Sequence, residues 1–306
     1  MGTRYEAPES GSVPIRTYPY SSVIKFFCNP QLQENDTMME APWKGAMEPF
    51  RILGNTWFVG TGPASTHIID SGDGLIMLDS GYCESLYLVL DSMYRCGLDP
   101  RNLRYIIHSH GHIDHAAATR ALVELTGAET FIGAGDLRMV DGSRPELSWA
   151  PEYEMAFPPP FTPDHLIHDG DRIELGDVAI DCVETPGHTP GVISFFWNVE
   201  DRGRVYRAGT FGGAGLNSLH SDYIRRYHLE SEDWRGAFRK SLRRAKAEKV
   251  DLFIGNHAGQ NHTPERYRRL KSGDPLAFVD PAAWGAFLAE CEAAFARLEA
   301  EDPLDR

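Results

Sequence analysis

The chain has 306 residues, 42% of them hydrophobic, which is enough to bury the core of one large domain. Its 44 acidic and 30 basic residues give a formal net charge of -14, which repels phosphate backbones and anionic lipid headgroups. No apolar run reaches the roughly 18 residues of a membrane-spanning helix. We therefore expect a small-molecule substrate, with neither nucleic acid nor a membrane as partner.

The N-terminal segment differs in composition from the rest. Residues 1–47 are rich in Pro, Ser, Tyr and Phe without a sustained period, which predicts an arm that wraps over the domain or over a second copy in a homodimer. Residues 48–306 are expected to form the folded domain, ending in a helix. The N-terminus MGTRYEAPESGSVPIRTYPY lacks the features of a secretory signal, so we expect a cytoplasmic protein unless a leader was removed.

Short β-type runs separated by turn signals open the domain. Gly72-Asp73-Gly74 predicts a hairpin between two of them. A helix and the apolar strand LRYII then complete a βαβ unit. The elements expected here are strands at 51–60, 65–70, 74–81 and 103–107 and a helix at 84–94.

Strands and helices continue to alternate toward the C-terminus. The last segment carries an apolar stripe at helical spacing, from Trp284 to Leu298, typical of a surface helix packed on the body. Two β-rich halves with helices outside predict an α/β fold, an αβ/βα sandwich. The elements expected here are helices at 115–126, 231–249 and 280–301, strands at 129–134, 193–199, 204–209 and 251–255, and a β-meander at 172–187.

The stretch HSHGHIDH, residues 108–115, follows the predicted strand 103–107 directly. His110 and His112 lie on one side of an extended segment, and Asp114 and His115 come where the chain turns into a helix. Imidazole and carboxylate are the non-thiolate ligands that zinc prefers, and functional groups gather at the carboxyl ends of strands. The five cysteines form no CxxC pair and do not suggest a thiolate site.

Two further histidines follow predicted turns or strands. His188 lies in TPGHTPG, a tight turn before a strand, and His257 comes directly after the strand DLFIG. Either histidine alone is weak support for a metal site. Together with the first cluster they predict one site built from distant strand ends.

H-x-H-x-D-H with TPGHTPG resembles the metallo-β-lactamase superfamily over residues 48–260. The resemblance implies an αβ/βα sandwich with one or two zinc ions per chain at the edge of the sheets. In this family a metal-bound hydroxide attacks an electrophilic carbon of a small molecule. The implied ligands are His110, His112 and His188 for the first zinc and Asp114, His115 and His257 for the second, with Asp114 and His115 as catalytic residues.

One family feature is missing, because Thr210 stands where most two-metal members have a bridging aspartate. The Asp-His-His second site then resembles the subclass of metallo-β-lactamases with three histidines in the first site. Residues 211–219 and the segment after His257 also resemble the hydrolytic dehalogenases that act on chlorothalonil. By this comparison Thr210 holds a water rather than a metal, and Asn217 either approaches the second metal through its amide oxygen or caps a loop.

Other residues are candidates for support. Asp79 and Ser109 could fix the free N–H of a ligating imidazole, although Asp79 could equally be a turn former. His108 is expected to be structural. Trp149 and Tyr153 could line an apolar pocket or simply pack.

The sequence therefore predicts a zinc-dependent hydrolase, with hydrolytic dehalogenation of a chlorinated aromatic such as chlorothalonil as the specific hypothesis. A β-lactam, other cyclic amide, ester or lactone hydrolase is the alternative within the superfamily. A non-catalytic metal-binding scaffold is the alternative of another class, and metal-dependent turnover separates it from an enzyme.

Overall fold

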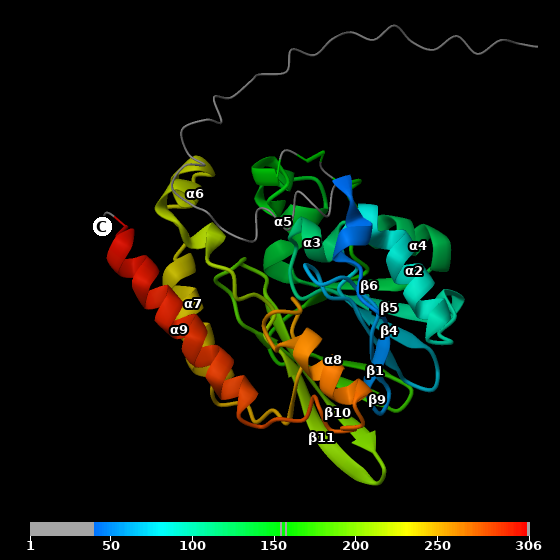
Figure 1. Ribbon diagram of the computed structural model, residues 1–306. Coiled ribbons are helices and arrows are strands. Elements are labelled where there is room, and N and C mark those ends of the chain that lie inside the picture. Colours follow the sequence, from blue (N-terminus) through cyan, green and yellow to red (C-terminus); the bar gives the residue numbers. More distant parts are fainter. Residues whose placement is uncertain (1–39, 154, 157, 305–306) are drawn as a thin grey trace, which may run out of the picture.

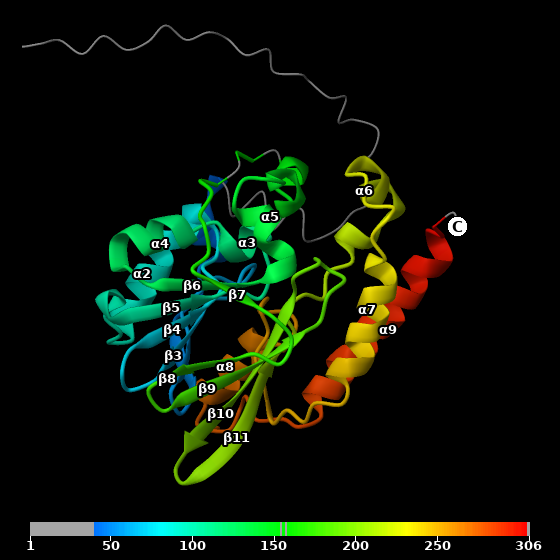
Figure 2. The same cartoon turned by 180° about the vertical axis from the view of Figure 1, so that it is seen from behind.

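The computed structural model describes residues 40–153, 155–156 and 158–304. Two β-sheets face each other, and helices cover the outer face of each sheet (Figures 1 and 2). The layers run from α2 and α4, through the two sheets, to α7 and α9. The predicted αβ/βα sandwich is confirmed.

The first sheet has seven strands in the order β1 to β7. Its first four strands pair antiparallel, and β4 to β7 pair parallel. The run expected as one strand at 51–60 is a hairpin instead, because the chain reverses at Gly54 with a positive φ of 49°. The strands are β1 (Phe50–Leu53), β2 (Thr56–Phe58), β3 (His67–Asp70), β4 (Leu75–Leu78), β5 (Leu103–Ile107), β6 (Glu129–Gly133) and β7 (His165–Ile167).

The second sheet has five strands in the order β12-β11-β10-β9-β8. All its pairs are antiparallel except that of β11 with β12. The expected meander at 172–187 is the β8–β9 hairpin and the loop that follows it. The strands are β8 (Arg172–Leu175), β9 (Val178–Glu184), β10 (Ile193–Asp201), β11 (Arg204–Thr210) and β12 (Leu252–Phe253).

The helices differ from the predicted ones mainly near the histidine motif. The helix expected at 115–126 begins earlier, at Ile113, and consists of two pieces, so Asp114 and His115 lie in the first helical turn. The α-helices are α2 (Leu86–Arg95), α3 (Ile113–Ala116), α4 (Thr119–Thr126), α5 (Leu137–Val140), α6 (Ser221–Arg226), α7 (Trp234–Ala245), α8 (Thr263–Lys271) and α9 (Ala283–Glu301). The 3-10 helices are η2 (Pro42–Gly45), η3 (Cys83–Ser85), η4 (Pro100–Asn102), η5 (Ala134–Asp136), η6 (Pro145–Ser148), η7 (Pro151–Tyr153) and η8 (Asn217–Leu219).

Separate apolar clusters hold the layers together. Ile76 and Ile107 of the first sheet meet Phe195 and Trp197 of the second. Residues of α2 and α4 pack on the outer face of the first sheet in another cluster. Burial of this apolar area stabilises the sandwich and fixes where the strands end.

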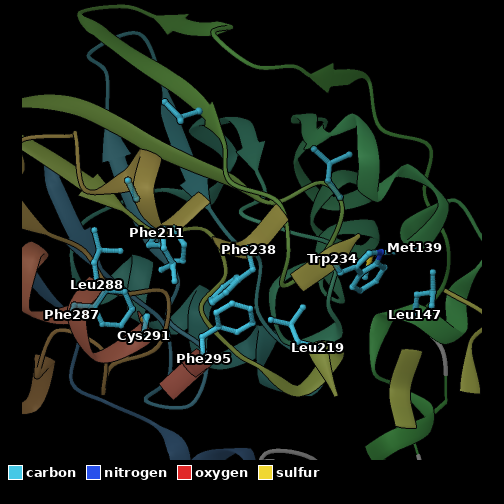
Figure 3. Packing of buried hydrophobic residues seen from close by; sticks show 14 of the residues in the cluster. Met139, Leu147, Phe211, Leu219, Trp234, Phe238, Phe287, Leu288, Cys291 and Phe295 are labelled. Atoms are coloured by element: carbon cyan, nitrogen blue, oxygen red, sulfur yellow. The ribbon is translucent and has the colours of Figure 1, made fainter. Parts of the chain in front are cut away.

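The outer layer on the second sheet is rich in aromatic residues. Phe238 of α7 meets Phe295 of α9 with ring centroids 5.1 Å apart, beside Phe211 at the end of β11 (Figure 3). The predicted stripe of α9 is confirmed, because its six apolar members are buried. These six are Trp284, Phe287, Leu288, Cys291, Phe295 and Leu298.

The C-terminal end of α9 is tied to the body by a buried guanidinium. Arg235 donates hydrogen bonds to the backbone oxygen of Leu219, at 2.7 Å, and to the backbone oxygen of Asp302, at 2.6 Å. It also pairs with the Asp302 carboxylate at 2.9 Å. This clamp fixes α9 along the side of the second sheet.

Residues 1–39, which make up most of the predicted N-terminal arm, lie outside the described residues. The proposed homodimer contact through that arm remains a prediction. Among the described residues, none of the helices combines the length and apolar character needed to cross a membrane.

Candidate metal centre

The predicted ligands come together at one end of the sandwich. His110 and His112 lie in the loop after β5, and Asp114 and His115 lie in α3, which this loop enters. The β9–β10 loop brings His188 to the same place, and the loop after β12 brings His257. Strands from both sheets thus deliver side chains to a single edge, as expected for an α/β fold.

Three of the histidines form one half of the centre. The ligand atoms of His110, His112 and His188 all lie within 4.8 Å of one another. Their rings meet edge to face, with centroids 4.4 to 4.7 Å apart. The Nε2 atoms of His110 and His188 face each other at 3.2 Å. This group is called the three-histidine half.

Asp114, His115 and His257 form a second group, called the Asp-His-His half. The Nε2 atom of His115 lies 3.2 Å from Oδ2 of Asp114 and 3.3 Å from Nε2 of His257. Nε2 of His257 is 3.6 Å from the same carboxylate oxygen. His110 also has a ligand atom within 4.8 Å of those of Asp114 and His115, so the two halves adjoin at His110.

Fixed acceptors hold most of these rings through their other nitrogen. Nδ1 of His115 donates to Asp79 at 2.8 Å, and Nδ1 of His188 donates to the backbone oxygen of Gly215 at 2.7 Å. Nδ1 of His257 bonds to the backbone oxygen of Pro63. Such bonds select the tautomer and direct Nε2 toward the centre.

Asp79 and Ser109 lie where support for the ligands was predicted. The Asp79 carboxylate accepts the backbone N–H and the hydroxyl of Ser109, each at 2.7 Å, besides the bond from His115. The Ser109 hydroxyl oxygen in turn lies 3.0 Å from Nδ1 of His110. Asp79 has a positive φ of 59°, a conformation uncommon for residues with a Cβ atom. This carboxylate therefore contacts one half directly and the other through Ser109.

Burial lowers the pKa values of the histidines in both halves, but for His115 the neighbouring carboxylates have the larger effect. Burial lowers the pKa of His188 to about 4 and holds the pKa values of His110 and His112 well below their usual range. Burial also opposes protonation of His115, but the carboxylates of Asp114 and Asp79 outweigh it and raise its pKa to about 10. Neutral imidazoles are the form that binds a metal ion, so the three-histidine half is ready to bind.

His108 lies apart from the centre, in keeping with its predicted structural role. Its Nδ1 bonds to the backbone oxygen of Phe131 at 2.8 Å, and its Nε2 lies 2.7 Å from the hydroxyl of Thr119. Both ring nitrogens have partners within the body of the fold. Nothing in this arrangement leaves His108 available as a ligand.

Among the described residues, the side chains of Thr210 and Asn217 make no hydrogen bond to the proposed ligands. Thr210 ends β11 and is fully buried, and its hydroxyl has no hydrogen-bond partner within residues 40–304 as described. Asn217 begins η8 and lines the cleft above the histidines. Their predicted roles, holding a water and approaching the second metal, remain predictions.

The centre opens into a cleft of about 1010 Å³. Trp149 and Tyr153, for which the sequence left two alternatives open, both line this cleft, and the indole of Trp149 packs near His112 with ring centroids 6.4 Å apart. The charged groups among its described lining residues are Lys44, Asp114 and Glu290. The cleft is large enough for a drug-sized substrate.

The donor set fits bound metal ions. Burial keeps His110 and His188 neutral, and the bonds at Nδ1 direct the lone pairs of their facing Nε2 atoms toward each other. Nε2 of His112 is buried without a hydrogen-bond partner among the described residues. An unsatisfied buried acceptor destabilises a fold, whereas a cation between the three nitrogens would satisfy all of them. The three imidazoles and the adjoining Asp-His-His group offer nitrogen and oxygen ligands, which suit zinc.

Comparison with known proteins places this fold and site in a family. Residues 59–257 match the Metallo-beta-lactamase superfamily. This chain belongs to the Metallo-beta-lactamase superfamily. The match includes all six predicted ligands, from His110 to His257.

Solved structures of the superfamily share the fold. BJP-1, a subclass B3 metallo-beta-lactamase of Bradyrhizobium japonicum, has a TM-score of 0.78 at 24% identity, over 86% of this chain and 97% of that chain. At this identity the likeness shows the fold alone. Native FEZ-1 metallo-beta-lactamase from Legionella gormanii has a TM-score of 0.77 at 26% identity, over 84% of this chain and 97% of that chain.

Two of the curated relatives are named as a hydrolase and a lactonase. Hydroxyacylglutathione hydrolase of Anaeromyxobacter dehalogenans is 28% identical over 153 residues, 50% of this chain and 48% of that protein. N-acyl homoserine lactonase AttM of Agrobacterium fabrum is 27% identical over 164 residues, 45% of this chain and 57% of that protein. The chain thus spans about half the length of these relatives. The predicted enzyme class, a metal-dependent hydrolase, is consistent with them.

Some residues around the centre were not predicted from the sequence. Phe287, Glu290 and Cys291 of α9 line the cleft, although α9 was expected only to pack on the body. Asp136, after β6, lies buried beside the loops that carry His110 and His188. Its place after a strand that runs parallel to β5 is a signal that could have indicated it.

Proposed function

We propose that this protein is a zinc-dependent hydrolase with two metal ions per chain. The observation that carries the proposal is the convergence of six potential ligand side chains at the base of an open cleft. Membership of the superfamily supports hydrolysis as the reaction type. The proposed ligands are His110, His112 and His188 for one ion and Asp114, His115 and His257 for the other.

Zinc held by these residues would supply Lewis acidity and would make water a nucleophile near neutral pH. The chain's own residues supply orientation. Asp114 presents its carboxylate beside His115 and His257, where it can accept a hydrogen bond from the attacking water. Asp79 keeps His115 in place, and Trp149 shields one side of the cleft from bulk solvent.

Charge in the cleft favours a small, uncharged electrophile. Lys44 is the one basic side chain besides histidine among the described lining residues, and it is accompanied by the carboxylates of Asp114 and Glu290. Aromatic surface from Trp149 and Tyr153 suits a flat, apolar ring. Our specific proposal is hydrolytic dehalogenation of a chlorinated aromatic such as chlorothalonil, in which water adds a hydroxyl to a ring carbon and chloride and a proton leave.

A second candidate is hydrolysis of a β-lactam or a lactone. Its support is the likeness to FEZ-1, which extends over 84% of this chain, together with the relation to AttM. Both reactions would use the same two-metal centre, so the substrate has to be decided by experiment. A metal-binding scaffold without catalysis is the remaining alternative.

The test combines zinc content per chain with a panel of substrates. Chlorothalonil with chloride release, nitrocefin, and an acyl-homoserine lactone are each assayed before and after chelation, and again after zinc is restored. Chloride release that a chelator abolishes and zinc restores supports the dehalogenase. Turnover of nitrocefin or of the lactone alone transfers the assignment to the second candidate, and bound zinc without turnover of a broad panel favours the scaffold.

A further inference from the structure

Asp136 is a buried carboxylate at the end of β6, outside the proposed ligand set. Its side chain is fully enclosed, and it accepts three hydrogen bonds. The backbone N–H of Gly111 donates at 2.8 Å and the hydroxyl of Thr189 at 2.6 Å, both to Oδ2, and the backbone N–H of Gly191 donates at 2.6 Å to Oδ1. Three hydrogen bonds to one carboxylate are strong and directional, and they connect the segments that donate them.

The three donors belong to the two loops that carry the three-histidine half. Gly111 lies between His110 and His112, and Thr189 follows His188 directly. The loops are separated by more than seventy residues in the chain, since His110 and His188 are 78 positions apart. One side chain therefore connects both loops immediately beside their proposed ligands.

The backbone of residues 133–136 packs closely against the backbone of residues 190–191. A Cβ atom on Gly133 would lie 1.9 Å from the backbone oxygen of Gly191, and one on Gly191 would lie 2.3 Å from the backbone nitrogen of Asp136. A Cβ atom on Gly135 would lie 2.6 Å from the backbone of Pro190. The segment 133–136 thus packs directly on the loop that follows His188.

We propose that Asp136 is a positioning residue that holds the two loops in register, so that the three-histidine half is formed before metal binds. The inference rests on the proposed function only in taking these histidines as metal ligands. Ligands must be held to within about 0.5 Å of their working geometry, and loops alone do so poorly. Outer partners of metal ligands are worth about 10- to 100-fold in metal affinity.

The test measures metal affinity and ligand geometry separately from activity. Asp136→Asn keeps the size of the side chain but turns an N–H₂ group toward at least one of the three donors. Zinc affinity is measured by competition with a chromophoric chelator, and ligand geometry by the visible spectrum of the cobalt-loaded protein. We expect about a 10- to 100-fold loss of affinity at one of the two ions and altered cobalt bands.

Two controls separate positioning from simple stabilisation. Asp164→Asn removes a similar carboxylate, which accepts the backbone N–H of Thr130 at 2.8 Å and its hydroxyl at 2.9 Å, far from the ligand loops. We expect this variant to keep the wild-type zinc affinity and cobalt spectrum. A wild-type affinity and spectrum in Asp136→Asn, with only the melting temperature lowered, would overturn the proposal.

A milder pair covers the case in which Asp136→Asn does not fold. Thr189→Val removes one of the three bonds, and Thr189→Ser keeps the hydroxyl. We expect weaker zinc binding in the valine variant and wild-type binding in the serine variant, and equal binding in both overturns the proposal. Wild-type protein that binds metal but hydrolyses nothing refutes only the proposed function, whereas wild-type protein that takes up no metal refutes this inference as well.

Discussion

The two halves of the metal centre are built differently, although both take ligands from the stretch 108–115. The three-histidine half borders the cleft but is deeply buried, since His110, His112 and His188 are 1%, 3% and 6% exposed. The Asp-His-His half contains a carboxylate and faces the cleft, with 13% of the Asp114 side chain and 22% of the His257 side chain exposed. We expect the ion in the three-histidine half to exchange more slowly and the substrate to meet the Asp-His-His half first.

Loss of a ligand should have the largest effect and should separate the halves. Asp114→Ala and His115→Ala are expected to abolish hydrolysis and to leave the fold and the ion of the three-histidine half in place. His112→Ala is expected to remove the ion of the three-histidine half. Metal content per chain and turnover are measured together, and normal turnover in Asp114→Ala or His115→Ala would refute the site.

Loss of the carboxylate that holds His115 should have an intermediate effect on zinc affinity. Asp79→Asn is expected to lower the affinity of the Asp-His-His half for zinc about 10- to 100-fold, because His115 loses the acceptor of its Nδ1 proton. Asparagine tolerates the positive φ of this position, so the backbone is preserved. Chelator competition at both ions is the measurement.

The same variant tests how far the halves are independent. Asp79 reaches His110 only through Ser109, so the loss at the three-histidine half should be smaller. Ser109→Ala is the matched control and should affect that half more than the other. Equal losses at both ions in Asp79→Asn would show that the halves act as one unit.

A carboxylate added at Thr210 should tighten the second ion. Thr210→Asp introduces a buried charge at the end of β11, which destabilises the metal-free protein but is offset when a cation neutralises it. We expect zinc affinity to rise about tenfold and the melting temperature to depend more strongly on zinc. Unchanged stoichiometry and affinity would mean that Thr210 does not face the centre.

His108→Ala should have the smallest effect on the metal. The variant removes one of the hydrogen bonds to the backbone oxygen of Phe131 and one of those to the hydroxyl of Thr119, and it creates a small cavity, so the free energy of unfolding should fall by about 2 kcal/mol. Zinc content should stay at the wild-type value. Loss of zinc in a folded variant would contradict the structural role of His108.

The sequence was sufficient to predict which histidines and which aspartate come together, because most of them are close in the chain. His110, His112, Asp114 and His115 lie within a span of six residues that follows β5, and that spacing carries most of the signal. His257 is 142 positions away from His115 but comes shortly after β12, so the rule that functional groups lie near strand ends was enough.

Features that depend on which loops meet could not be predicted in this way. The role of Asp136 exists only because β6 lies beside β5 and its end packs on the loop after His188. The cleft wall on α9 arises because this helix runs along the second sheet toward the centre. The helix α8 was missed because TPERYRRLK is almost entirely polar and shows no apolar period.

Because α9 both packs on the sheet and borders the cleft, its sequence positions divide into two groups for anyone wishing to alter the substrate range. Phe287 and Cys291 are buried as well as cleft-lining, so changes there alter stability and binding at once. Glu290 is exposed and Ala294 half-buried, and both border the same cleft. A library restricted to these two positions would sample new cleft shapes and charges while leaving the aromatic layer and the metal centre intact.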